Sequence, residues 1–231
     1  MFTLNQYASS DELTQNMVKH IVAALNKGIA ERGMASIAVS GGKTPIPLFK
    51  LLSQQELPWS KVYITLVDDR WVDDTDDASN EKLVLSYLLQ NQAKLANFIG
   101  LKNSAATPFE GELEAQQKLA EVPMPFDVVI LGMGEDGHTA SLFPHAKNLA
   151  AGLDMHSGKL VMDMTPLTAP LDRITLTLPA ILNSQNIYLH LVGESKKVVL
   201  DKATQGKDIT DMPIRAVLQQ DKVKVIGFWC A

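Results

Sequence analysis

Helix-like and strand-like segments alternate along most of this 231-residue chain, and that alternation constrains the fold more than any other feature. Apolar residues recur every four positions after Ser10 and Asp11, which predicts a helix capped by these two residues and ended by Gly33. Short apolar runs typical of buried strands occupy residues 35–40, 62–67, 98–101, 126–131, 160–164, 174–178, 186–192 and 223–229. Helices are expected between them, near residues 45–52, 80–89, 110–120 and 195–203.

This order of elements predicts an α/β fold with a mainly parallel sheet and helices on both faces. No internal repeat or Pro/Gly-rich linker divides the chain, so we expect a single domain over residues 1–231. Ligands of such sheets bind beyond the carboxyl ends of the strands. Candidate functional residues follow three strands, as Ser40-Gly41-Gly42-Lys43-Thr44, Asp68-Asp69-Arg70 and the run from Gly132 to His138. We expect these three segments to converge on one site.

Charge and composition exclude several classes of function. The chain has 21 Lys and Arg against 26 Asp and Glu, a net charge of −5, without the basic surplus of a nucleic-acid-binding protein. No apolar run approaches the ~18 residues of a membrane span. The N-terminus shows no basic leader or apolar signal core, so a cytoplasmic protein is expected. The lone Cys230 cannot form an internal disulfide. The oligomeric state stays open.

The segment from Ser40 to Thr44 lies between an expected strand and an expected helix. Its two glycines let the backbone turn tightly and approach a ligand, and its polar side chains add donors. These features suit a phosphate monoester. The segment is not a Walker A loop, because Ile37 stands where the first glycine of that motif belongs. A plain glycine turn with a helix cap is the alternative.

The run from Gly132 to Gly137 has the G-x-G-x-x-G spacing of dinucleotide sites. Pro144 follows too early for the long helix of such a site, and the run lies past the middle of the chain, so a dinucleotide is disfavoured. His138 comes next, where an imidazole can act as a general base near neutral pH, and Asp136 can orient it. A histidine that only bonds the loop backbone is the structural alternative.

Other charged residues are candidates for the same site. The carboxylates of Asp68 and Asp69 can orient water or a sugar hydroxyl, and Arg70 can hold an oxyanion or a phosphate. A solvated turn leading into the acidic residues 73–77 is the alternative for this segment. Lys196, at the start of a helix, is a further candidate for binding phosphate. Arg173 and Arg215 are candidate cations that are more often structural.

Several other chemistries find no support in the sequence. The G-x-S-x-G elbow of serine hydrolases is missing. His145 and His156 form no metal-ligand spacing with His138, so no metal site is expected. His20 and His190 are interpreted as packing or surface residues.

The motifs resemble those of the 6-phosphogluconolactonase family, within the glucosamine-6-phosphate isomerase/deaminase-like superfamily. The matching segments are SGGKTPIPLF from Ser40, Asp68-Asp69-Arg70 with Ser79-Asn80, GMGEDGHTASLFP from Gly132, RITLTLPAILNS from Arg173 and GESKK from Gly193. They cover much of the chain in the same order, and GHTASLFP is the most specific of them. One departure is Asp69, where the family carries Glu.

The resemblance implies a modified Rossmann-like domain that uses no cofactor. It implies hydrolysis of a phosphorylated sugar lactone, the δ-lactone of 6-phosphogluconate, in the oxidative pentose phosphate pathway. His138 would be the catalytic base with Asp136 beside it, and Asp68 and Arg70 would line the substrate. The residues implied for phosphate binding are Ser40, Gly41, Gly42, Lys43, Thr44, Arg173 and Lys196.

Two other functions stay open on the sequence. Related deaminases and isomerases of amino-sugar phosphates carry a Glu five residues after the histidine, as part of a proton relay, and this chain has Phe143 there. The missing relay carboxylate favours lactone hydrolysis over deamination. A catalytically silent sugar-phosphate sensor would use the same pocket, although the intact His138 beside Asp136 argues against it.

Overall fold

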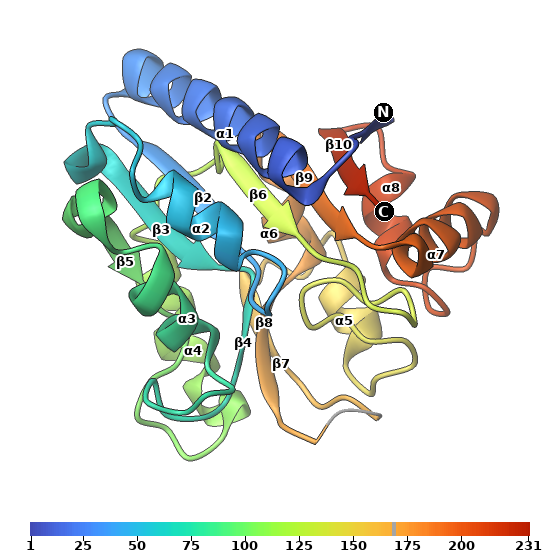
Figure 1. Ribbon diagram of the computed structural model, residues 1–231. Helices are drawn as coiled ribbons and strands as arrows, with labels where there is room; N and C mark the ends of the chain where they lie inside the picture. The colour runs from blue at the N-terminus through green and yellow to red at the C-terminus, as the bar shows by residue number, and fades with distance from the viewer. Residues whose placement is uncertain (168–169) are drawn as a thin grey trace.

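The computed structural model describes residues 1–167 and 170–231, and its centre is a parallel sheet of seven strands (Figure 1). The strand order across the sheet is β1 (Phe2–Gln6), β10 (Lys224–Cys230), β9 (Asn186–Val192), β6 (Val128–Leu131), β2 (Ala35–Val39), β3 (Val62–Leu66) and β5 (Asn97–Ile99). Every neighbouring pair runs parallel. The predicted α/β class with a mainly parallel sheet is therefore confirmed.

A second, antiparallel sheet extends the fold below the first. It consists of β4 (Asp68–Arg70), β8 (Arg173–Leu176) and β7 (Val161–Met164). The sequence pattern placed residues 68–70 after the strand of residues 62–67, and it did not predict that they form a strand of a second sheet. Val67 is where the chain changes sheets: its N–H donates to Val39 of the first sheet at 3.0 Å, and its carbonyl accepts from Leu176 of the second at 2.8 Å.

Helices cover both faces of the parallel sheet. The helices of the whole fold are α1 (Ser10–Arg32), α2 (Ile46–Leu52), α3 (Asn80–Tyr87), α4 (Pro108–Leu119), α5 (Leu149–Leu153), α6 (Leu178–Leu182), α7 (Glu194–Gln205) and α8 (Ile214–Leu218), with 3-10 turns at Trp59–Lys61 and Asn91–Leu95. Helices α1 and α2 pack together over one face, and α6 lies on the other (Figure 1). In the part of the chain that the structure describes, the helices are too short or too polar to cross a bilayer.

The start of α1 differs slightly from the sequence prediction. The N-cap is Ser9 rather than Ser10 or Asp11, because the Ser9 hydroxyl accepts the N–H of Glu12 at 3.2 Å. The Glu12 carboxylate in turn accepts the N–H of Ala8 at 2.9 Å. This reciprocal arrangement satisfies two free donors at the helix start. Gly33 ends the helix as predicted, with a φ of 81° that favours glycine.

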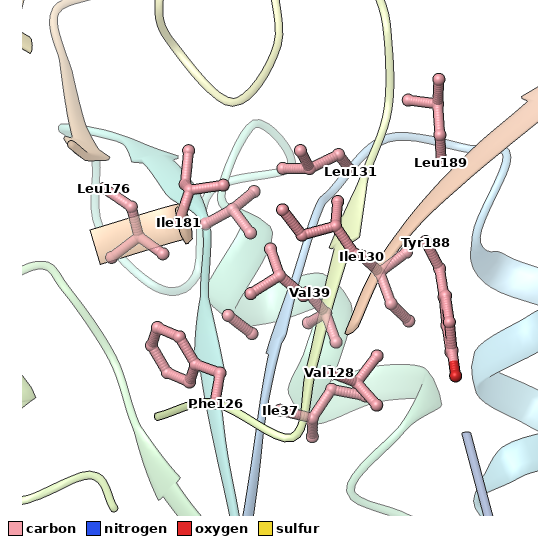
Figure 2. Packing of buried hydrophobic residues seen from close by; sticks show 14 of the residues in the cluster. Ile37, Val39, Phe126, Val128, Ile130, Leu131, Leu176, Ile181, Tyr188 and Leu189 are labelled. Carbon is pink, nitrogen blue, oxygen red and sulfur yellow. The ribbon is translucent and has the colours of Figure 1, made fainter. Parts of the chain in front are cut away.

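The core lies where β2 and β6 run side by side (Figure 2). Ile37 pairs with Val128 across these strands, and both side chains are fully buried, as is Val39. The sequence prediction missed β1, because Phe2–Gln6 is a half-exposed edge strand that carries polar residues and pairs only with β10. A packed centre of this kind gives the loops that follow β2 and β6 a fixed base.

Candidate active site

A cavity of about 220 Å³ opens at the carboxyl edge of the parallel sheet. Its lining residues are Ser40, Gly41, Gly42, Thr44, Pro45, Asp68, Arg70, Asn80, Gly132, Met133, Gly134, His138, Ala140, Arg173, His190, Val192 and Lys196. The three segments singled out from the sequence thus surround one cavity. Lys43 is exposed and does not line it, and Asp136 reaches it only through His138.

The loop of residues 40–44 presents backbone donors to this cavity. In the described part of the chain, the N–H groups of residues 41–44 have no protein acceptor. Gly42 has a φ of 92°, a conformation that side chains rarely adopt, so a glycine is needed for this turn. A cluster of free N–H groups of this kind suits an anion such as a phosphate.

Asn80, at the start of α3, connects this loop to the charged end of the cavity. Its amide oxygen accepts a hydrogen bond from Nη1 of Arg70 at 2.6 Å, and its amide nitrogen donates to the carbonyl of Asp68 at 2.8 Å. A Cβ on Gly41 would overlap the Asn80 amide, so the absent side chain makes room for it. Asn80 therefore holds Arg70 and Asp68 in place against the loop of residues 40–44.

Asp69 points away from the cavity and fixes the start of α3. Its carboxylate accepts the N–H groups of Arg70, Asn80 and Glu81 at 2.8, 2.7 and 3.0 Å. Burial raises the pKa of Asp69 to about 6, although these hydrogen bonds oppose the rise. The side chain thus positions its neighbours and has no direct access to a ligand in the cavity.

His138 is held by the loop that carries it. Its Nδ1 lies 2.6 Å from Oδ1 of Asp136, and the same carboxylate oxygen accepts the His138 N–H at 3.0 Å. Burial would raise the pKa of Asp136, but the hydrogen bonds from His138 outweigh it and the pKa falls. A Cβ on Gly134 would overlap the imidazole. Because Nδ1 is engaged, Nε2 is the ring nitrogen left for chemistry in the cavity.

The ring of Phe143 contacts both the imidazole of His138 and the guanidinium of Arg173. Its ring stacks on His138 with centroids 4.3 Å apart, and the guanidinium of Arg173 lies 5.3 Å from its centroid. Arg173 pairs with Arg70 across β8 and β4. Burial lowers the pKa of Arg173, and the charge of Arg70 adds to the effect. The two guanidinium groups on the lining that also holds this imidazole can bind negative oxygens of a ligand.

Lys196, in the first turn of α7, lines the cavity and carries an ammonium group. Its Nζ lies 2.7 Å from a carboxylate oxygen of Glu135, which also accepts a hydrogen bond from Ser195 at 3.2 Å. The hydrogen bond from Lys196 lowers the pKa of Glu135. Arg215 is buried in α8 and donates to the carbonyls of Ala203 and Asp208, which gives it a structural role away from the cavity.

Sequence reasoning missed two polar residues of the lining, Asn80 and His190. The sequence pattern identified Asn80 only as part of a motif. Its available signal was Ser79, a residue type that caps helices, which indicated that Asn80 would begin one. His190 was interpreted as a packing or surface residue, whereas it is 7% exposed and lines the cavity. Burial lowers the pKa of His190 to about 4, so its imidazole is neutral at pH 7.

Comparison with known proteins finds relatives over the whole chain. The family model described as glucosamine-6-phosphate isomerases/6-phosphogluconolactonase matches residues 8–226. The 6-phosphogluconolactonase of Neisseria meningitidis serogroup A is 38% identical over 231 residues, 99% of each chain. That of Mesorhizobium japonicum is 40% identical over 228 residues, 99% of this chain and 95% of the relative. A solved 6-phosphogluconolactonase from Shewanella baltica is 48% identical, with a TM-score of 0.98, and covers 100% of this chain and 98% of that one.

Proposed function

The chain belongs to the glucosamine-6-phosphate isomerase/6-phosphogluconolactonase family, and from that premise we propose that it hydrolyses 6-phosphoglucono-δ-lactone to 6-phosphogluconate. This makes it a carboxylic ester hydrolase of sugar-phosphate metabolism, with a phosphorylated sugar lactone as its substrate. The observation that carries the proposal is the His138–Asp136 pair, 2.6 Å apart, in a cavity that also contains two arginines and a loop of free N–H groups.

The reaction starts with neutral His138 as a general base. Nε2 takes a proton from a water molecule while the water oxygen forms a bond to the lactone carbonyl carbon. Asp136 holds the ring and stabilises the imidazolium that results. Because the water attacks directly, no covalent enzyme intermediate forms.

The tetrahedral intermediate carries a negative oxygen. Arg70 or backbone N–H groups of the glycine loops stabilise it, and one such donor is typically worth about 10²–10³ in rate. When the bond between the carbonyl carbon and the ring oxygen breaks, the leaving ring oxygen recovers the proton from the imidazolium. The products are the free hydroxyl and the carboxylic acid, which ionises.

The phosphate of the substrate is far from the reacting carbonyl and serves to position it. The N–H groups of residues 41–44 and the ammonium of Lys196 hold this phosphate, with Ser40, Thr44 and Arg173 beside them. Anchoring one end of the ring aligns the carbonyl with the water on His138. Lys43 supports this site only through long-range charge, because its side chain is exposed.

Phe143 favours hydrolysis over deamination of an amino-sugar phosphate. A proton relay for ring opening needs a second acid near the histidine, and the group packed on His138 is instead an aromatic ring. We also infer that residues 1–231 act as one domain, because segments from Ser40 to Lys196 contribute to the same cavity.

The test is a coupled assay on freshly generated lactone, corrected for spontaneous hydrolysis. The wild-type chain should produce 6-phosphogluconate far above the background, and His138→Ala should lose about 10²–10⁴ of the rate, the range for a general base. His138→Ala should still bind 6-phosphogluconate. Wild-type protein that binds the product without turnover would be a sensor, and release of ammonia from glucosamine 6-phosphate would indicate a deaminase.

A further inference from the structure

His190 occupies an unusual place for a histidine on a central strand. Side chains alternate along β9, so His190 shares a sheet face with Tyr188. Tyr188 packs against Phe228 of β10, with ring centroids 5.4 Å apart, and against His20 of α1 at 6.1 Å. His190 pairs with Phe228 in register. The face around it is therefore apolar and covered by α1.

On its other side, His190 adjoins a residue without a side chain. Leu189 pairs with Leu131 of β6, so Gly132 comes next to His190 along the neighbouring strand. A Cβ placed on Gly132 would meet no atom within 4 Å. Both Gly132 and His190 line the cavity.

The two ring nitrogens of His190 are unpaired within residues 1–167 and 170–231. Among the described residues, neither ring nitrogen makes a hydrogen bond or an ion pair, although the residue is only 7% exposed. No polar side-chain atom in that part of the chain is both sealed from solvent and without a partner. The ring nitrogens of His190 thus remain accessible, and the cavity is the opening that the residue lines.

A neutral imidazole offers one N–H donor and one acceptor. Burial keeps this ring neutral near pH 7, so it can donate without being charged. An unpaired polar group at a nearly buried position is costly unless a ligand or water satisfies it. A ligand that fills the cavity gives the donor of His190 a partner.

The neighbours of His190 along the chain indicate which part of the ligand it contacts. His190, Val192 and Lys196 succeed one another along β9 and the first turn of α7, and all three line the cavity. Lys196 is the cation of this segment. We propose that His190 is a further substrate-binding residue, whose neutral ring donates a hydrogen bond to a phosphate oxygen of the sugar phosphate. The identity of that ligand rests on the proposed function.

The first test compares ligand affinities of His190→Leu, His190→Gln and the wild type. His190→Leu should weaken the binding of inorganic phosphate and of 6-phosphogluconate about tenfold, the size expected for a hydrogen bond to a charged group. His190→Gln keeps an N–H donor and should restore part of the affinity. In turnover, KM should rise more than kcat falls. Binding of gluconate, which lacks the phosphate, should not change between the variants.

His20→Leu is the matched control. His20 contacts the same aromatic cluster, with its ring 5.2 Å from Phe228, but does not line the cavity. Its affinity for inorganic phosphate should equal that of the wild type. A loss as large as that of His190→Leu would assign the effect to packing and overturn the proposal.

Two further outcomes would contradict the proposal. If His190→Leu binds inorganic phosphate as tightly as the wild type, His190 does not contact the phosphate. If the variant loses affinity for 6-phosphogluconate alone, His190 contacts a sugar hydroxyl instead. Should His190→Leu fail to fold, nitrogen NMR of the wild-type histidine rings decides instead: the His190 signal must shift on saturation with inorganic phosphate. The binding and NMR measurements are independent of lactone turnover, so their outcome can be told apart from a failure of the hydrolase assignment.

Discussion

The two glycine-containing loops of the cavity follow neighbouring parallel strands, yet they are built in opposite ways. After β2, the N–H groups of residues 41–44 have no acceptor in the described protein. After β6, the loop is tied to itself: the N–H of Gly134 donates to the carbonyl of His138 at 2.9 Å, and that of Gly137 donates to Gly134 at 3.0 Å. The Thr139 hydroxyl adds a bond to the Gly132 carbonyl at 2.8 Å.

The difference fits the two tasks proposed for these loops, which are anion binding and the positioning of a general base. A loop that binds an anion works through backbone donors that the protein itself does not use. A loop that positions a base must use its own N–H donors in hydrogen bonds that hold one side chain in one orientation. In both loops, a missing Cβ makes room for a neighbour: Gly41 for Asn80, and Gly134 for the His138 ring.

Gly134→Ala should give the largest effect. The new methyl group must displace the imidazole from Asp136, so the rate should fall about 10³-fold, within the range for losing a general base. Phosphate affinity should change much less than the rate. Measuring kcat and the dissociation constant of inorganic phosphate on one preparation checks both, and equal losses would show that the loops are not independent.

Gly41→Ala should affect binding and rate together, by about 30-fold, because the displaced Asn80 no longer holds Arg70 and a guanidinium contact of this kind is worth about 2 kcal/mol. Gly42→Ala is the comparison variant. Its Cβ meets no atom within 4 Å, but its φ of 92° is strained for alanine. It should lose about 1–2 kcal/mol of stability and less activity. Thermal unfolding and steady-state kinetics separate the two patterns.

The two histidines of the cavity extend the comparison to pH. The pKa of His190 falls from 6.5 to about 4 on folding, so the unfolded chain binds its proton more tightly between these values. The contribution of neutral His190 to the free energy of unfolding is fully present above pH 6.5, and it is lost as the pH falls towards 4. The raised pKa of Asp69 acts in the opposite sense, so only a difference between variants isolates His190.

The free energy of unfolding should therefore be measured for the wild type and for His190→Leu from pH 7 to pH 4. The wild type should lose roughly 3 kcal/mol relative to the variant, given about 1.4 kcal/mol for each unit of pKa shift between 6.5 and about 4. Parallel curves over this range would mean that His190 is solvated in the folded protein.

The smallest effect distinguishes two lysines. Lys196 lines the cavity and Lys43 does not, so Lys196→Ala should raise KM about tenfold and Lys43→Ala less than about twofold, since exposed charges are strongly screened. Initial rates at low and high salt check the assignment. A larger effect for Lys43 would place the phosphate outside the loop rather than within it.

The sequence predicted the convergence of the site better than its details. Carboxyl ends of parallel strands share one edge of a sheet. The alternation of helices and strands therefore predicted that Ser40, Gly132 and Lys196 lie close together. The pairing of Arg70 with Arg173 was beyond that argument, because it depends on an antiparallel sheet that begins where Val67 changes partners. Nothing local in an apolar strand signals such a switch.

His190 shows a second limit of sequence reasoning. A histidine inside the run of residues 186–192 fits a packed strand. The alternation of side chains along a strand tells only which face it shares with its neighbours. Its access to the cavity depends on register, which places a glycine beside it on β6. Asn80 likewise gains its contacts with Arg70 and Asp68 only through the tertiary fold.

The ion pair between Lys196 and Glu135 has a consequence for turnover. The ammonium of Lys196 lies 2.7 Å from a carboxylate of the protein itself, so a phosphate bound there as proposed exchanges one anion for another. The net gain in affinity is smaller than an unpaired lysine would provide. When the reaction is over, Glu135 can reclaim the ammonium and so speed the departure of the acid product, which carries one more negative charge than the lactone.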